Sequence, residues 1–480
     1  MHDPTSPIGA PAAKTSPAAP QSPMIPHHSS SRPIALLAIT AVAATLLPLA
    51  PTRAAYDFTQ LTALANGALA GQNVNTPVPG FEIRLLKHGV PIYHEVFGAW
   101  SLNRPANADS STKTLSGALM TSVADSADGG FSLDSHLADF LPEYNVPGFR
   151  DITIRQAFSH TSGIAGDEQA LVLYQKNISL RQAAAIIKQT PLAFTPGSTF
   201  SYGGLSMQVA GAAAEVATGQ DYIDLFAERL TTPLAMTNTR FVLASDTNPR
   251  VAGGIESTAA DFSRFMDMLA NDGVDRVTGT RILSSAAVNE MLARQTNDGQ
   301  PIANSPADNN RYGVGVWVDQ LTQAGPPVEA LAAGARGFHS WIDQRNDLVF
   351  TFATELSHFA NVEVLSSMMH AAILETVPAA DFDFNGTVDA ADLALWQIAC
   401  GATAAADANG DGVSDGADFL EWQRSLTSPG GWAAAVSQTS PVPEPGALTI
   451  IGIALAAMAR RRWRRQSKRA IPRHSFMARP

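Results

Sequence analysis

Ser110 and Lys113 are the first residues in this sequence whose types and spacing could do chemistry. They form an S-x-x-K motif just ahead of a segment with helical periodicity, and Lys113 supplies the only such match among the six lysines of the chain. A serine at a helix start lies near backbone N–H groups that favour a developing negative charge, and a lysine one turn later shares its face. The pair predicts a nucleophile with its own proton partner. An N-capping serine followed by a solvated lysine is the alternative.

The elements that would position this pair are read from hydrophobic periodicity. Residues 80–100 alternate like two strands joined by a turn at His88–Pro91, and further strands are predicted at 311–320, 337–344 and 347–354. Helical spacing of apolar residues predicts helices at 110–127, 171–190, 204–218, 221–230, 258–271 and 362–375. Strands at both ends with helices between them predict one sheet closed by distant segments, an α+β fold.

Three further motifs follow the S-x-x-K serine in order. They are the stretch "SLDSHLADFLPEY", the run His160-Thr161-Ser162-Gly163, and Pro196-Gly197 leading to Tyr202. This order resembles the serine β-lactamase-related family, which includes class C β-lactamases, penicillin-binding D,D-peptidases, esterases and D-aminopeptidases. The resemblance spans residues 56–377 and implies an antiparallel sheet flanked by helices, with an inserted helical subdomain.

The resemblance also implies roles for individual residues. Ser110 would be the acylated nucleophile and Lys113 its proton partner, while Tyr202 matches the tyrosine of the second family motif, Y-x-N. A phenol beside cationic or polar groups is expected to ionise more easily and to carry a proton to the leaving group. We interpret His160 and Ser162 as structural residues of a buried turn.

Two positions depart from the family pattern. The second motif reads Tyr202-Gly203-Gly204, so the substrate-orienting amide is missing, and the strand expected to carry K-T-G or H-x-G reads "LAAGARGFHS". No lysine occurs between residues 189 and 467. On this strand we expect Gly334 to offer a backbone N–H as the second oxyanion donor. Arg336 is the candidate replacement for the missing cation.

The predicted function is a serine hydrolase that cleaves an ester or amide through an acyl-enzyme on Ser110. The missing carboxylate contact favours an esterase or D-amino-acid amidase. The alternatives are a D,D-peptidase or β-lactamase, and a catalytically degenerate surface binding protein. A class A β-lactamase is disfavoured because its S-D-N triplet is absent from the sequence.

A second chemical motif occurs twice near the C-terminus, in "DFDFNGTVDAAD" and "DANGDGVSDGAD". Oxygen-bearing groups recur at the spacing that surrounds a calcium ion, with glycine at position 6. The pair resembles a type I dockerin, which implies bound Ca²⁺ and a cohesin-type partner. The overlapping G-x-S-x-G at 412–416 lies inside this loop and is not interpreted as a nucleophile elbow. The candidate ligands are Asp381, Asp383, Asn385, Thr387, Asp389 and Asp392 in the first loop, and Asp407, Asn409, Asp411, Val413, Asp415 and Asp418 in the second.

Both ends carry targeting patterns. Arg32 and the apolar run 34–50 are typical of a signal peptide cleaved after Ala54 or Ala55. Near the other end, "PVPEP", an apolar run and an arginine cluster resemble the PEP-CTERM sorting signal, which implies export, transient membrane anchoring and a location at the envelope or surface of a Gram-negative-type bacterium. The predicted organisation is an N-terminal extension and signal peptide (1–55), a hydrolase domain (56–377), a calcium module (381–426), a linker (427–440), a sorting segment (441–465) and a basic tail (466–480).

Composition limits the remaining possibilities. The 480-residue chain is 45% hydrophobic and 16% charged, as expected of a globular protein. Its formal net charge of −11 argues against nucleic acid as a partner. With Cys400 as its one cysteine, the chain has no internal disulfide and no cysteine-rich zinc site.

Overall fold

The computed structural model describes residues 56–320 and 327–426. The predicted signal peptide, linker, sorting segment and basic tail lie outside these ranges. Within them, no helix is both long enough and apolar enough to cross a membrane.

A five-stranded antiparallel sheet forms the centre of the domain predicted at residues 56–377. Its strand order is β2-β1-β10-β9-β8, so the N-terminal hairpin pairs with the C-terminal strands, as Ile83 opposite Phe352 illustrates. Seven of the eight residues of β1 are buried because layers cover both faces of the strand. The predicted closure of one sheet by distant segments is therefore confirmed. The strands are β1 (Gly80–Lys87), β2 (Val90–Gly98), β8 (Ala330–Ala333), β9 (His339–Asp343) and β10 (Leu348–Ala353).

The hairpin turn is shorter than predicted. Lys87 pairs directly with Val90, which leaves only His88 and Gly89 in the turn, both with positive φ (50° and 71°). Two such residues form the tight turn whose twist suits a hairpin. Pro91 therefore belongs to β2, where it is tolerated because β2 is an edge strand.

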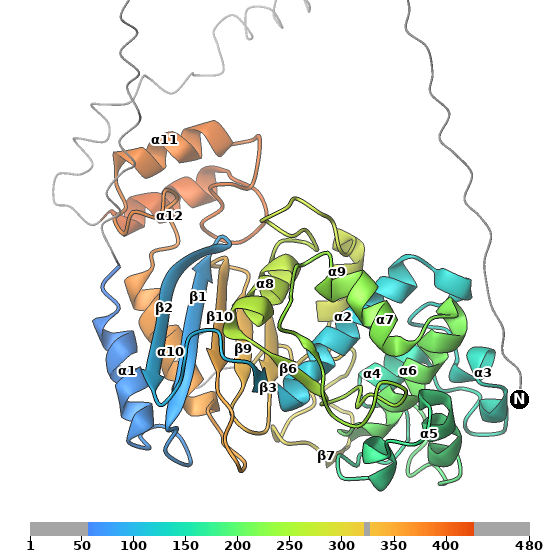
Figure 1. Cartoon of the computed structure of the whole chain (residues 1–480). Helices are drawn as coiled ribbons and strands as arrows, with labels where there is room; N and C mark the ends of the chain where they lie inside the picture. The colour runs from blue at the N-terminus through green and yellow to red at the C-terminus, as the bar shows by residue number, and fades with distance from the viewer. Residues whose placement is uncertain (1–55, 321–326, 427–480) are drawn as a thin grey trace, which may run out of the picture. The chain divides into compact units, whose positions relative to one another are not determined.

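Helices cover both faces of the sheet (Figure 1). On one face, α10 (Glu363–Thr376) packs against β9, where the indole N–H of Trp341 donates to Ser366 Oγ at 3.1 Å. On the other, α8 (Ala259–Ala270) lies against β1, β9 and β10. A second helix, α1 (Thr59–Leu69), lies beside α10 and contacts it.

The helical subdomain lies between β2 and the C-terminal strands in sequence. The helix predicted at 171–190 divides in two because Ser179 begins a new helix with a capping box to Gln182. The strand predicted at 311–320 is wrong: Gly315 has a positive φ of 77°, and only isolated bridges form there. The subdomain contains η1 (Asp109–Ser111), α2 (Thr112–Asp125), η2 (Asp128–Gly130), α3 (Leu137–Phe140), η3 (Pro142–Tyr144), α4 (Ile154–Phe158), η4 (Leu171–Tyr174), α5 (Leu180–Ile187), α6 (Leu205–Thr218), α7 (Tyr222–Phe226), the π-helical η5 (Ala227–Thr231) and α9 (Ser285–Leu292).

Two small sheets lie outside the five-stranded sheet: one contains β3, which comes shortly before Ser110, and the other contains β4, which comes directly before Tyr202. One has the order β3-β6-β5 and the other joins β4 to β7 in parallel. Their strands are β3 (Ala106–Asn107), β4 (Phe200–Ser201), β5 (Arg240–Phe241), β6 (Ile255–Ser257) and β7 (Ile302–Asn304).

The C-terminal module has its own core. Buried apolar side chains form one cluster from Phe58 to Val377 and a second from Ala380 to Trp422. Within the module, α11 (Ala390–Ala399) and α12 (Gly416–Ser425) are tied reciprocally. The Trp396 indole N–H donates to the Asp415 carbonyl and that of Trp422 to the Asp389 carbonyl, each at 2.8 Å.

Candidate active site

Ser110 lies in η1, the turn that leads from β3 into α2. The turn is fixed on one side because the Ala108 N–H donates to the Ile255 carbonyl of β6 at 2.9 Å. Asp109, the residue before the nucleophile, has a φ of 45°, a strained conformation for a residue with a Cβ. Its carboxylate accepts hydrogen bonds from Nε and Nη2 of Arg336, at 2.9 and 2.8 Å, which hold the turn in place.

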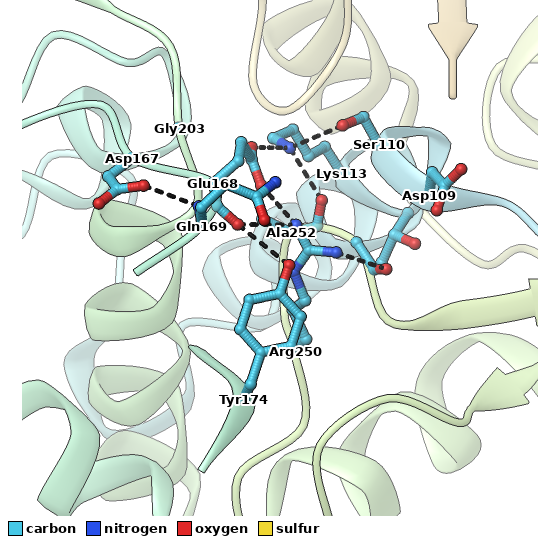
Figure 2. A network of polar contacts seen from close by, with 12 residues as sticks. Asp109, Ser110, Lys113, Asp167, Glu168, Gln169, Tyr174, Gly203, Arg250 and Ala252 are labelled. Atoms are coloured by element: carbon cyan, nitrogen blue, oxygen red, sulfur yellow. Dashed lines mark hydrogen bonds and ion pairs between the residues drawn. The ribbon is translucent and has the colours of Figure 1, made fainter. Parts of the chain in front are cut away.

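Lys113 is buried beside Ser110, with 1% of its side chain exposed. Its Nζ donates to Ser110 Oγ at 3.1 Å and to the Ala252 carbonyl at 2.8 Å. A third contact, at 2.6 Å, joins Nζ to Oε1 of Glu168 (Figure 2). The S-x-x-K pair therefore has the predicted geometry, and the solvated-lysine alternative is wrong.

Tyr202 lies directly after β4 and reaches the same point. Its ring lies 4.6 Å from Lys113 Nζ, and it stacks on Trp317 with ring centres 5.6 Å apart. Burial raises the pKa of the Tyr202 phenol, and the opposing influence of Lys113 is smaller. The expectation of easier ionisation is therefore wrong: Tyr202 is a neutral phenol that can donate a proton or a hydrogen bond.

His160 and Ser162 have contacts that fit the structural role expected for them. His160 Nδ1 accepts a 3.4 Å hydrogen bond from the Gly203 N–H, and its ring lies 4.5 Å from that of Tyr202. Burial, followed by the charge of Lys113, holds the pKa of His160 well below its usual range, so the ring is neutral. The Ser162 hydroxyl accepts from the Ile164 N–H within the same turn.

The structure corrects both predictions on the strand that borders the site. The Gly334 N–H donates to the Phe338 carbonyl at 2.7 Å, so it is not free to stabilise an oxyanion. The adjacent residue, Ala335, lines the pocket, and its N–H has no hydrogen bond within the described ranges. Arg336 is held by Asp109 and by Glu355, at 3.0 Å, and does not line the pocket. It therefore supports the nucleophile turn and is not a substrate contact.

A pocket of about 320 Å³ opens over Ser110. Its wall is mostly apolar, and no lysine or arginine belongs to the described part of its lining. Burial lowers the pKa of His339 in the wall to about 3, so this imidazole is neutral as well. The charged groups lining the described pocket are acidic, Glu168 and Glu363. The other lining residues are Tyr202, Asn304, Ser305, Pro306, Ala307, Trp317, Gln320, Leu331, Ala333, Gly334, Ala335, Phe359, Ala360, Asn361 and Val362.

Comparison with known proteins identifies the family. The sequence model of the beta-lactamase family matches residues 66–366, well over half of the chain. The chain belongs to the beta-lactamase family. The family resemblance and the α+β fold predicted for the hydrolase domain are thereby confirmed, and this family of hydrolases includes esterases, amidases and D-aminopeptidases.

Individual beta-lactamase-family relatives are more distant. The chain is 32% identical over 197 residues to penicillin-binding protein 4 of Amycolatopsis lactamdurans (35% of this chain, 51% of the relative). It is 26% identical over 336 residues to a D-aminopeptidase of Cereibacter sphaeroides (62% and 61%). The chain thus spans about half to three-fifths of the length of these curated relatives.

Solved structures show the same fold. A protein of Bacteroides dorei assigned as a beta-lactamase superposes with a TM-score of 0.58 at 26% identity, covering 67% of this chain and 99% of that one. A family VIII carboxylesterase superposes with a TM-score of 0.54 at 18% identity, covering 65% and 97%, and shows the fold alone. A PEP-CTERM protein-sorting motif also matches residues 441–465, which indicates an exported protein of Gram-negative bacteria.

Two residues of the site were missed by sequence reasoning. Glu168 reaches Lys113 from the loop that follows the His160 turn, and Arg250 binds Glu168 Oε2 at 2.8 Å from the segment before β6. Neither belongs to a beta-lactamase-family motif, and no spacing pattern connects them to Ser110. Only the fold brings these segments together.

The C-terminal module places several of the predicted calcium ligands close together. One oxygen from each of Asp381, Asp383 and Asp392 lies within 4.8 Å of the others. The two loops repeat their internal bonds: Asp381 accepts from the Gly386 N–H, as Asp407 does from that of Gly412. Asp389 and Asp415 begin α11 and α12 as N-caps, with Asp392 and Asp418 completing the capping boxes. The remaining predicted ligands line the loop turns: Asn385, Thr387, Asn409, Asp411 and Val413.

Proposed function

We propose that this protein is an exported serine hydrolase that cleaves an ester or amide through an acyl-enzyme on Ser110. The observation that carries the proposal is the 3.1 Å hydrogen bond from Lys113 Nζ to Ser110 Oγ at the base of a pocket. Proton transfer through Lys113 would accompany attack by Ser110. The neutral Tyr202 phenol would donate to the leaving group.

The substrate we favour carries no carboxylate next to the scissile bond. The described pocket lining offers apolar groups and two acids but no cation, and Arg336 is bound to Asp109 and Glu355. A substrate carboxylate would lose hydration there without gaining a charged partner. Neutral esters and amides, including those of D-amino acids, suit this lining better than β-lactams or D-Ala-D-Ala peptides. The D-aminopeptidase relative supports the amide alternative.

The experiment is labelling of the full-length chain with a fluorophosphonate probe, read by intact mass. We expect a single adduct on Ser110, and hydrolysis of p-nitrophenyl acetate faster than that of nitrocefin. Faster nitrocefin turnover would favour a β-lactamase. A long-lived adduct with fluorescent penicillin would favour a D,D-peptidase. Well-folded protein without any adduct would favour the degenerate binding protein.

We also propose that the C-terminal module binds Ca²⁺ and takes part in display of the enzyme at the cell surface. The clustered oxygens of Asp381, Asp383 and Asp392 support the first loop as a site for a hard cation. The repeated loop bonds and the reciprocal tryptophan contacts support a paired unit. Because an ion that binds only the folded module stabilises it, EDTA should lower the melting temperature of the module and Ca²⁺ should restore it. An unchanged melting curve would reject calcium binding. The cohesin-type partner stays a prediction.

A further inference from the structure

The two glycines of the second motif make room for one loop. A Cβ on Gly203 would lie 2.4 Å from the Asp167 nitrogen and 2.7 Å from the Gly166 carbonyl carbon. From the other segment, a Cβ on Gly166 would lie 2.2 Å from the Tyr202 carbonyl oxygen. Real Cβ atoms do not come this close to backbone, so the two segments can touch only as glycines. This contact brings the Asp167–Glu168 segment over the nucleophile.

Gly204 leaves space for a carboxylate. It begins α6 with a φ of −90°, which any residue can adopt. A Cβ there would point toward Glu168, 3.4 Å from Oε2, and would lie 3.1 Å from Leu173 Cδ1. An amide projecting from position 204 would therefore meet the Glu168 carboxylate, together with Leu173 and Ala252. An asparagine at 204 and a glutamate at 168 compete for the same space.

Glu168 is fixed from both sides. Oε1 accepts from Lys113 Nζ at 2.6 Å, while Oε2 accepts from Arg250 Nη2 at 2.8 Å (Figure 2). The Glu168 carbonyl accepts from Arg250 Nη2 at 3.2 Å and from the Tyr174 hydroxyl at 3.1 Å. A side chain held by this many charge-assisted bonds has one orientation.

We infer that Glu168 replaces the missing amide and acts on the nucleophile through Lys113, as the residue that positions the ammonium group and accepts its proton during acylation. The inference rests on the proposed function, since it assigns a role within that reaction. It also accounts for the glycine at 204, the position of the family's amide, and for the glycine at 203, which lets the loop that carries Glu168 approach.

The proton path balances with Lys113, Glu168 and Tyr202 alone. As the Ser110 Oγ bonds to the carbonyl carbon, its proton passes to Lys113 Nζ, and Nζ gives one proton to Glu168. The carbonyl oxygen carries the negative charge of the tetrahedral intermediate. When the intermediate collapses, the bond to the leaving group breaks, the Tyr202 phenol gives its proton to that group, and the proton held by Glu168 returns through Nζ to the phenol oxygen. Lys113 remains an ammonium ion before and after the step.

The pH dependence follows from the groups that face Glu168, namely Lys113, Arg250, Tyr202 and Tyr312. Burial raises the pKa of Glu168, but Lys113 and Arg250 outweigh it and hold the pKa below the ordinary 4.5. Acylation needs the carboxylate, so its rate should fall only below about pH 4.5. Removing the Arg250 charge should raise the pKa of Glu168 and move this acid limb to higher pH.

The first test measures the rate of fluorophosphonate labelling of the full-length chain against pH. Glu168→Gln should slow labelling by roughly 100-fold or more and abolish the acid limb. Glu168→Asp should restore part of the rate together with the limb. Arg250→Gln should shift the limb upward and lower the plateau rate by less than Glu168→Gln does, because Glu168 loses one of the two cations that fix it. The matched control is Asp128→Asn, which breaks the ion pair between Asp128 and Arg229. The side chain of Asp128 is 28% exposed, against 21% for Glu168.

The second test introduces the asparagine of the family motif at position 204, with and without Glu168. Gly204→Asn alone should slow labelling because the new side chain displaces Glu168, and adding Glu168→Ala should recover at least tenfold of the loss. Gly416→Asn, at the start of α12 where nothing lies within 4 Å of a Cβ, controls for the substitution itself. Melting curves of every variant identify those that have not folded, and only folded variants are compared.

The outcomes separate this inference from the proposed function. No adduct on Ser110 of the unmodified chain would overturn the function, and the inference with it. Labelling of Glu168→Gln within threefold of the unmodified rate, with the same pH profile, would overturn the inference alone. Failure of Glu168→Ala to improve Gly204→Asn would show that the two side chains do not share one role, which also overturns it.

Discussion

Two regions border Ser110, and each lacks the polar group that the family places there. At the second motif the loss at Gly204 is matched by Glu168 from another loop. At β8 the lost cation has no replacement in the described pocket lining, since Arg336 binds Asp109 and Glu355. The difference follows from what each group faces. The second-motif position faces Lys113, a buried charge that needs a partner, whereas β8 faces a pocket that solvent and substrate can fill.

Both regions matter for function only if Ser110, which lies between them, is a reactive nucleophile. Ser110→Ala should abolish fluorophosphonate labelling, because it removes the pocket hydroxyl that Lys113 contacts. Intact mass before and after incubation measures this. Ser132→Ala, an exposed serine bonded only within its own turn, should label like the unmodified chain. An adduct that persists in Ser110→Ala would place the reactive group elsewhere.

Apolar substitutions in the two regions should differ most in stability. Glu168→Leu leaves the Lys113 ammonium without its closest partner and should lower the free energy of unfolding by about 3 kcal/mol. Ala333→Leu on the pocket wall breaks no ion pair and should change it by less than about 1 kcal/mol. Urea unfolding of both variants provides the values. Equal losses would show that the second motif has no special need for a charge.

Arg336 follows β8 and binds Asp109 in the turn that holds Ser110. Its substitution tests whether this segment supports the turn or contacts the substrate. Arg336→Met frees Asp109 to leave its strained conformation, whose backbone cost is about 2 kcal/mol. An energy of this size corresponds to a labelling rate about 30-fold lower. The affinity for the probe before the covalent bond forms should stay nearly the same, because Arg336 does not line the pocket. A large loss of affinity with an unchanged maximal rate would instead make Arg336 a substrate contact.

The smallest expected effect comes from restoring a cation to β8. Ala333 lines the pocket, so Ala333→Lys should favour substrates with a carboxylate by about tenfold relative to neutral esters, the value of one charge-assisted hydrogen bond. Rates with fluorescent penicillin and p-nitrophenyl acetate give this ratio. Ala333→Met controls for side-chain length. An unchanged ratio would mean that a missing cation is not what limits carboxylate recognition.

Much of the local structure of this protein follows from patterns in its sequence. Local patterns predicted the hairpin of β1 and β2, the helix after Ser110, the pairing of Ser110 with Lys113, and the paired loops that begin at Asp381 and Asp407. Each of these depends on residues close together in the chain, where spacing along a helix, strand or turn fixes which side chains share a face. The same patterns failed at 311–320, where glycines override an alternating run.

How the departures from the family pattern are resolved depends on contacts between segments that are distant in sequence. Glu168, Arg250 and Lys113 come from three segments that share no periodicity, and their contacts arise because the glycines at 166 and 203 let two backbones touch. Arg336 and Gly334 were misassigned for the same reason: whether a guanidinium or an N–H is free depends on partners distant in sequence. A buried charge must be paired wherever the fold can supply a partner, and sequence spacing alone does not say where that partner lies.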